Sequence, residues 1–167
     1  MDVEFFRRNW EPLAQRYLEN PESAAVTCAS RGTVAPEDVS CRVRTGRTVT
    51  VAGLHPAAGG TGADRSPADM LLEALVGCAG VTLRAVAEKL GFNLRAARID
   101  AEGELDLRGA LGLDSDAPVG FRAIRLHFAV DAPESDERLA ELARLTEQQC
   151  VVLQTLSCRP RLSVARA

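Results

Sequence analysis

The sequence predicts a mixed fold in which long helices and one-sided strands occupy separate stretches of a single globular domain. Residues 66–90 form a long apolar stretch with helical spacing, which begins at Ser66-Pro67 and stops at Gly91. Residues 98–108 alternate strictly between apolar and charged side chains, which is typical of a strand with one wet face. A chain of 167 residues that is 46% hydrophobic is long enough to build one real core.

Composition excludes several classes of function. A net charge of −3 and an aromatic content of 4% give no electrostatic or stacking basis for binding nucleic acid or an anionic membrane. We find no uninterrupted apolar run of about 18 residues and no secretory signal, so we expect a cytoplasmic protein that does not span a membrane. Five cysteines without a Cys-x-x-Cys pair, and only two histidines, predict reduced thiols with no metal and no cofactor.

Residues 1–21 predict an amphipathic helix that precedes the main domain, residues 22–167. Apolar side chains recur at helical spacing from Phe6 to Tyr17, and Asn20-Pro21 ends the pattern. The charges on the other faces are mixed, so we interpret this helix as one that docks on the rest of the protein or on a second copy.

Residues 22–65 carry strand and turn signals. We predict a strand over 25–29, a turn at 31–33, and a hairpin whose strands, 39–44 and 48–51, meet at Thr45-Gly46-Arg47. The glycine-rich stretch 53–65 lacks the spacing of a phosphate-binding loop, so we expect a flexible loop that leads into the long helix.

Within the long helix, Cys78 lies where the apolar face meets a polar stripe. A free cysteine is most often a small buried core residue, and nothing in this stretch alone argues otherwise. The border position would nevertheless keep a thiol sheltered and still reachable.

The second half of the chain predicts two strands, a helix and a closing strand. The strand over 98–108 is followed by a loop and by a strand over 124–130, with a bulge near Arg122-Ala123. A leucine repeat over 139–156 predicts one helix that contains Cys150, with an N-cap at Asp131 or Ser135. Residues 161–165 read as a short closing strand.

Two cysteine motifs carry a resemblance to a known family. The pattern Pro-x-(Asp/Glu)-x-Leu-Leu-x-Ala-Leu-x-Gly-Cys ends at Cys78, and Cys-x-Val-x-x-Thr-Leu begins 72 residues later at Cys150. Together with the order of strands around them, they resemble the OsmC/Ohr family of osmotically inducible and organic hydroperoxide resistance proteins over residues 22–166. The resemblance implies an α+β fold, in which antiparallel sheets wrap around long central helices in an intertwined homodimer.

The resemblance also implies a chemistry and the residues that perform it. Cys78 would be the peroxidatic thiolate that attacks a hydroperoxide, and Cys150 would resolve the resulting sulfenic acid as a disulfide. A thiol reductant, often a lipoylated protein in this family, would then reduce the disulfide. Arg31 resembles the arginine that activates the first cysteine, and the family holds this arginine with an acidic residue at the start of the helix. Asp69, nine residues before Cys78, resembles the acidic residue of other branches of the family.

The sequence departs from the hydroperoxidase pattern at two positions. Ala68 stands where those enzymes have glutamate, ten residues before the cysteine, and Val151 stands where they have proline. The nearby arginines Arg42, Arg44, Arg47 and Arg65 are alternatives to Arg31.

Two functions follow from these observations. The first is a thiol peroxidase for organic hydroperoxides, which would suit the apolar neighbours Leu71, Leu75 and Val81. The second is a small-molecule binding or thiol-sensing protein with little or no turnover. Within the first, Cys158 is an alternative resolving cysteine to Cys150.

Overall fold

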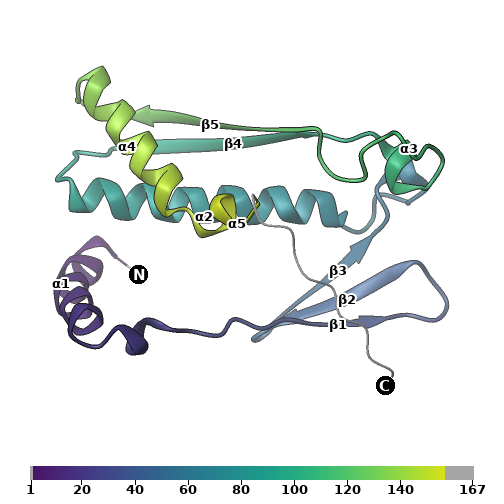
Figure 1. Ribbon diagram of the computed structural model, residues 1–167, viewed down its shortest axis with the longest axis horizontal. Helices are drawn as coiled ribbons and strands as arrows, with labels where there is room; N and C mark the ends of the chain where they lie inside the picture. Colours follow the sequence, from purple (N-terminus) through teal and green to yellow (C-terminus); the bar gives the residue numbers. More distant parts are fainter. Residues whose placement is uncertain (1, 157–167) are drawn as a thin grey trace. The chain divides into compact units, whose positions relative to one another are not determined.

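The computed structural model describes residues 2–156 and contains helices and antiparallel strands (Figure 1). In chain order the elements are α1 (Val3–Glu19), η1 (Pro21–Ala24), β1 (Arg31–Val34), β2 (Ser40–Thr45), β3 (Thr48–Gly53), η2 (Pro56–Ala58), α2 (Pro67–Lys89), β4 (Ala96–Glu104), α3 (Leu107–Ala110), β5 (Ala123–Asp131), α4 (Asp136–Gln149) and α5 (Val151–Leu156). The described residues divide into two compact units: unit 1 is residues 2–71 and 103–123, and unit 2 is residues 72–102 and 124–156.

The sheet of unit 1 is a three-stranded antiparallel meander in the order β1-β2-β3. Thr45 pairs with Thr48, so Gly46 and Arg47 form a two-residue hairpin loop, and Gly46 has the positive φ of 58° that such a loop requires. This confirms the predicted hairpin.

The predicted start of this sheet was wrong. Residues 25–29 form no strand, and residues 31–33, which we expected to be a turn, belong to β1 instead. Tertiary pairing decides the outcome, because Arg31 pairs with Arg44 and Val34 with Cys41 along β2. Gly32 permits this pairing, since a Cβ at this position would lie 2.9 Å from Cys41 Sγ.

The N-terminal helix is present as predicted. Asp2 caps α1 by accepting a hydrogen bond from the backbone N–H of Phe5 at 2.7 Å, and the helix ends at Asn20, before Pro21. Phe6 and Trp10 stack with ring centroids 5.9 Å apart, yet no side chain of α1 is buried. The division into an extension, 1–21, and a domain, 22–167, stays a prediction.

Unit 2 is built on the long helix α2, with β4 and β5 running alongside it (Figure 1). The two strands are antiparallel neighbours, because the N–H of Arg95 donates to the carbonyl of Asp131 at one end of the pair. One face of α2 is buried against them and against α4; its buried residues are Leu75, Ala79, Leu83, Val86 and Ala87. Each large apolar side chain buried in this way stabilises the fold by about 1.5–3 kcal/mol.

The strand predicted over 98–108 is displaced toward the N-terminus and ends at Glu104. Asp106 ends it, because its carboxylate accepts the backbone N–H of Arg108 at 3.1 Å and so begins the short helix α3. The same carboxylate also pairs with the guanidinium groups of Arg108 and Arg122. The alternation of apolar and charged residues continues to residue 108, but the strand ends earlier because Asp106 caps a helix.

The helix predicted over 139–156 is interrupted at Cys150. Ser135 caps α4, and this helix ends at Gln149, where Cys150 adopts an extended conformation before α5 begins. The predicted closing strand, 161–165, and Cys158 lie outside the described residues.

Among the described helices, α2 alone has the length and apolar composition that would suffice to cross a membrane. This observation does not identify a membrane protein, because core helices of soluble proteins have the same length and composition. Only 28% of its most apolar 18-residue window is buried within one chain.

Candidate active site

The predicted cysteine on the long helix lies at the edge of the unit 2 core. Cys78 is half-buried in α2 and packs against the apolar cluster formed by Leu75, Ala79 and Cys150. This agrees with its predicted place on the border between the apolar and polar faces of the helix. Cys78 therefore packs against carbon and keeps part of its surface exposed.

Cys150 meets Cys78 from the break between α4 and α5. It is fully buried, and its thiol forms a hydrogen bond with Cys78. Both cysteines are present as free thiols. The structure thus brings together the two cysteines that the sequence motifs singled out, although 72 residues separate them along the chain.

The interruption at Cys150 gives the pair further hydrogen-bond donors. The first N–H groups of a helix have no partner within the helix, and here the first two residues of α5 are Val151 and Val152. The backbone N–H groups of both residues donate to Cys78, and the hydroxyl of Thr82 donates from one turn along α2. These groups and the Cys150 thiol all act to lower the pKa of the Cys78 thiol.

The environment favours the thiolate form of Cys78. Burial by itself raises the pKa of the Cys78 thiol, but the hydrogen bonds to Cys78 from Val152, Cys150, Thr82 and Val151 outweigh burial. The net result is a pKa below the ordinary thiol value. A thiolate, and not a thiol, is the nucleophilic form of cysteine.

The pKa of Cys150 is shifted in the opposite direction. Burial raises its pKa above the ordinary thiol value, and the hydrogen bond and the negative charge of Cys78 raise it further, against a hydrogen bond from the backbone N–H of Leu153. When the first proton leaves this pair, it therefore leaves Cys78, and Cys150 remains a protonated donor. The two cysteine side chains are chemically identical, but their surroundings give them different pKa values.

Arg31 and Asp69 belong to unit 1, whereas the two cysteines belong to unit 2. Arg31 is an exposed residue of β1, within the strand where we had expected a turn. Asp69 lies in the first turn of α2 and accepts a hydrogen bond from Ser66 Oγ at 2.7 Å. Their predicted roles toward Cys78 stay predictions.

Comparison with known proteins identifies the family. The sequence profile described as OsmC-like protein matches residues 60–165, which include both cysteines. The chain belongs to the OsmC-like protein family. No protein with a curated description matches the sequence.

Solved structures agree with this assignment. An OsmC-like protein from Mycoplasma pneumoniae is similar at a TM-score of 0.68 and 19% identity, covering 79% of this chain and 88% of that one. An organic hydroperoxide resistance protein from Legionella pneumophila has a TM-score of 0.62 at 16% identity, with 80% and 90% of the two chains covered. The organic hydroperoxide resistance protein OhrB of Bacillus subtilis has a TM-score of 0.51 at 18% identity, with coverage of 78% and 90%. At these identities the likeness shows the OsmC-like fold alone.

Each unit of this OsmC-like chain also contains a cavity. The cavity of unit 2, about 270 Å³, is apolar and is lined from three elements, by Leu83 of α2, Phe128 and Val130 of β5, and Leu139, Leu142 and Ala143 of α4. Phe128 also packs against the cluster that contains Cys150, so this side chain borders both the cavity and the cluster of the thiol pair.

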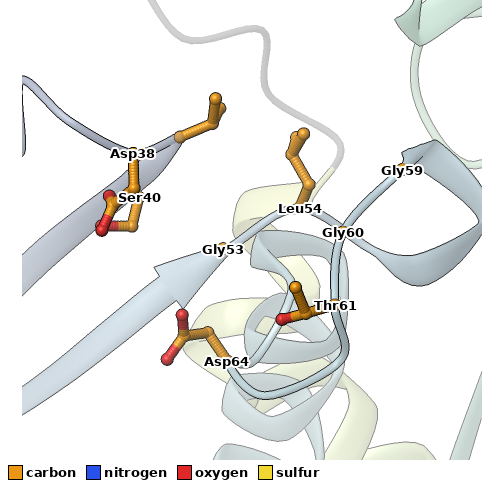
Figure 2. A pocket seen from close by; sticks show the side chains of 9 residues that line it. Asp38, Ser40, Gly53, Leu54, Gly59, Gly60, Thr61 and Asp64 are labelled. Carbon is orange, nitrogen blue, oxygen red and sulfur yellow. The ribbon is translucent and has the colours of Figure 1, made fainter.

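The cavity of unit 1, about 350 Å³, lies beside the glycine-rich loop (Figure 2). Figure 2 shows Asp38 and Ser40 on one wall and Thr61 and Asp64 on the other. Two carboxylates would repel a phosphate, which agrees with the interpretation of this stretch as an approach loop. In residues 2–156, no group of three or more acidic, histidine or cysteine side chains is placed to hold a metal ion.

Sequence reasoning missed three members of the thiol site. Thr82 follows Cys78 by four residues, a spacing that places two side chains on one helix face, so the sequence did contain a signal for it. The N–H groups of Val151 and Val152 carried no signal, because the leucine repeat favoured a continuous helix through Cys150.

Proposed function

We propose that this OsmC-like protein is a thiol peroxidase that reduces organic hydroperoxides, with Cys78 as the peroxidatic cysteine and Cys150 as the resolving cysteine. The observation that supports it most strongly is that the two motif cysteines pack against each other in one cluster, where the pKa of Cys78 is lowered and that of Cys150 is raised. A lowered pKa suits the nucleophile, and a raised pKa keeps the second thiol protonated until it is needed.

The proposed cycle has three balanced steps. The Cys78 thiolate attacks the distal oxygen of the hydroperoxide, the O–O bond breaks, and the alkoxide takes a proton to leave as an alcohol, while Cys78 becomes a sulfenic acid. The Cys150 thiol then attacks the sulfenic sulfur, which forms the disulfide and releases water. An external dithiol, for which we propose a lipoylated protein, restores both thiols and is itself oxidised to a disulfide.

The surroundings of the site favour an organic substrate over hydrogen peroxide. The cluster around the two cysteines is formed by carbon, with Leu75 and Ala79 on α2 and Phe128 on β5. Apolar surface adds binding free energy for a hydrocarbon group and none for hydrogen peroxide. The Legionella and Bacillus proteins of this fold are named as organic hydroperoxide resistance proteins, which supports the same choice.

Consumption of hydroperoxide by the intact protein tests this function. With dihydrolipoamide as the dithiol, we expect catalytic consumption of cumene hydroperoxide, and slower consumption of hydrogen peroxide at equal concentration. A protein that consumes neither beyond one equivalent would support the alternative, a binding or thiol-sensing protein.

We propose further that the protein acts in the reducing cytoplasm as a homodimer. The long apolar helix α2 supports the dimer, because only 28% of its most apolar window is buried within one chain and Val81 on it is 73% exposed. Sedimentation at about twice the chain mass of 17.9 kDa would agree with a dimer, and sedimentation at the chain mass would contradict it.

We propose that Arg31, held by Asp69, activates Cys78 by stabilising its thiolate. We expect Arg31→Ala to raise the pKa of Cys78, because a nearby cation stabilises a thiolate, and to slow the oxidation of Cys78 at neutral pH by about tenfold. The measurement is the pH dependence of sulfenic acid formation by stopped flow. Arg47, in the hairpin loop, is one of the alternative arginines, so Arg47→Ala is the competing variant, and an effect of Arg47→Ala equal to or larger than that of Arg31→Ala would contradict a specific role for Arg31.

A further inference from the structure

Three arginines share one face of the sheet in unit 1 (Figure 1). Arg31 of β1 lies directly opposite Arg44 of β2, and Arg42 lies two residues before Arg44 on the same strand. Side chains that lie directly opposite each other, or two residues apart along one strand, point to the same face of a sheet. The other residues of this face, which we call the arginine face, are Thr33, Val49 and Val51.

The arginine face is the open face of this sheet. All three of its arginines are exposed, whereas the opposite face carries the half-buried side chains of Cys41 and Val43 and the buried side chain of Ala52. The position of Gly32 agrees with this division, because a Cβ at Gly32 would meet the sulfur of Cys41 on the opposite face. The three guanidinium groups are therefore accessible to a partner.

The charges of the arginine face are not balanced by carboxylates of the described chain. In residues 2–156, no ion pair includes one of its arginines. The exposed arginines of the other sheet differ in this respect, because Arg98 pairs with Asp100 at 2.9 Å and Arg125 pairs with Glu102 at 3.4 Å. The arginine face is thus a local positive patch on a chain whose net charge is −3.

Hydrogen bonds hold two of these like charges together. The Ser30 hydroxyl donates to the backbone carbonyl of Arg44 at 3.1 Å and hydrogen-bonds the Thr45 hydroxyl at 2.8 Å, which fixes the start of β1 beside the end of β2. Like charges directly opposite each other destabilise a sheet, so the pair of Arg31 and Arg44 costs stability. An anionic partner would remove this cost, because it would neutralise both charges.

We propose that the arginine face binds an acidic segment of another protein, in which carboxylates at alternate positions of an extended backbone meet the three arginines. Residues two apart along a strand are about 7 Å apart, and directly opposite residues are about 5 Å apart. Both spacings are shorter than the Debye length of about 10 Å at 0.1 M salt, so the three charges act together on a partner. The inference does not depend on the proposed peroxidase activity.

An acidic protein segment fits this face better than a small anion or a nucleic acid. The cavity of unit 1 is lined by other residues, among them Asp38 and Asp64, so the arginines lie on an open surface and not in a pocket that would enclose a small ligand. The remaining side chains of the face, Thr33, Val49 and Val51, offer no aromatic ring on which a base could stack.

The test is the fluorescence anisotropy of a short labelled peptide in which glutamate alternates with serine, titrated with the reduced full-length protein at low salt. We expect the double change of Arg42→Gln and Arg44→Gln to weaken binding about tenfold, because each exposed ion pair contributes about a threefold factor in affinity. A peptide with glutamine in place of glutamate should bind the unmodified protein at least about tenfold more weakly. Arg31 is left unchanged, because a change there would also affect its proposed role toward Cys78.

The double change of Arg98→Gln and Arg125→Gln is the matched control. It removes the same charge from arginines that already pair with carboxylates, so it should alter the affinity by less than about twofold. Equal losses in the two double variants, or equal affinity for the two peptides, would overturn the inference. Tighter binding of oligodeoxythymidylate than of a glutamate peptide of equal charge would also overturn it, because the partner would then be a nucleic acid.

Two further measurements on the Arg42 and Arg44 double variant exclude other roles for the face. Its melting temperature should not fall, because the loss of the Arg44 charge removes the repulsion from Arg31. A lower melting temperature would show that the two side chains stabilise the sheet, and the inference would fail. It would also fail if this variant alone sedimented at a lower mass than the unmodified protein, because the face would then bind a second copy of the chain.

Discussion

Replacement of Cys78 with serine is expected to abolish hydroperoxide consumption, with a loss of about a thousandfold or more. Cys78 is the thiol of lowered pKa in the pair, and a serine hydroxyl in the same place neither ionises near neutral pH nor forms a sulfenic acid. The measurement is the initial rate with cumene hydroperoxide and excess dihydrolipoamide.

Cys28→Ser is the matched control for this change. Cys28 is an exposed free cysteine in unit 1, where we assign no chemistry to it. We expect this variant to keep the full rate. A Cys78→Ser protein that retains a substantial rate would show that another cysteine is the nucleophile, and the proposed assignment would be wrong.

Replacement of Cys150 with serine is expected to stop the enzyme after its first chemical step. Cys78 would still consume one equivalent of hydroperoxide, but Cys150, the buried thiol that packs against Cys78, would be missing and could not form the disulfide. We therefore expect a burst of one equivalent, followed by a rate at least about tenfold lower, limited by direct attack of the external dithiol on the sulfenic acid.

Trapping with dimedone makes this prediction specific. The Cys150→Ser protein should accumulate a dimedone adduct on Cys78, whereas the unmodified protein should yield little adduct because Cys150 competes with the reagent. If Cys150→Ser instead forms a disulfide between Cys78 and Cys158 and turns over at the normal rate, Cys158 is the resolving cysteine.

Much of the fold could be predicted because capping and turn residues mark where several helices and strands begin and end. The helix α2 begins after Ser66, whose side chain accepts the N–H of Asp69 at 3.1 Å, and ends before Gly91, which adopts a φ of 68°. The hairpin of β2 and β3 is specified by the glycine in its loop. In both cases the structure depends on residues that are neighbours in the sequence.

Predictions failed where distant residues decide the conformation. Gly32 resembles a turn residue, but pairing with β2 makes it part of a strand, and its missing Cβ leaves room for Cys41. Local patterns do not contain this information. The end of β4 was missed for another reason: the capping bond from the Arg108 N–H to Asp106 is local, but the apolar alternation continues past it.

In the candidate site, too, some residues could be predicted from sequence motifs and others could not. The two cysteine motifs identified Cys78 and Cys150, and the structure places their thiols in contact. The break at Cys150, which supplies the N–H groups of Val151 and Val152, follows an uninterrupted apolar repeat and was predicted as a continuous helix. The roles of Arg31 and Asp69 depend on how the two units pack together, so they stay predictions.

The most direct test of the proposed cycle is peptide mass spectrometry on the reduced protein after one equivalent of cumene hydroperoxide. We predict rapid formation of a disulfide between Cys78 and Cys150, and its absence in Cys78→Ser. If both thiols remain reduced for many minutes, Cys78 is not a peroxidatic cysteine and the peroxidase proposal fails.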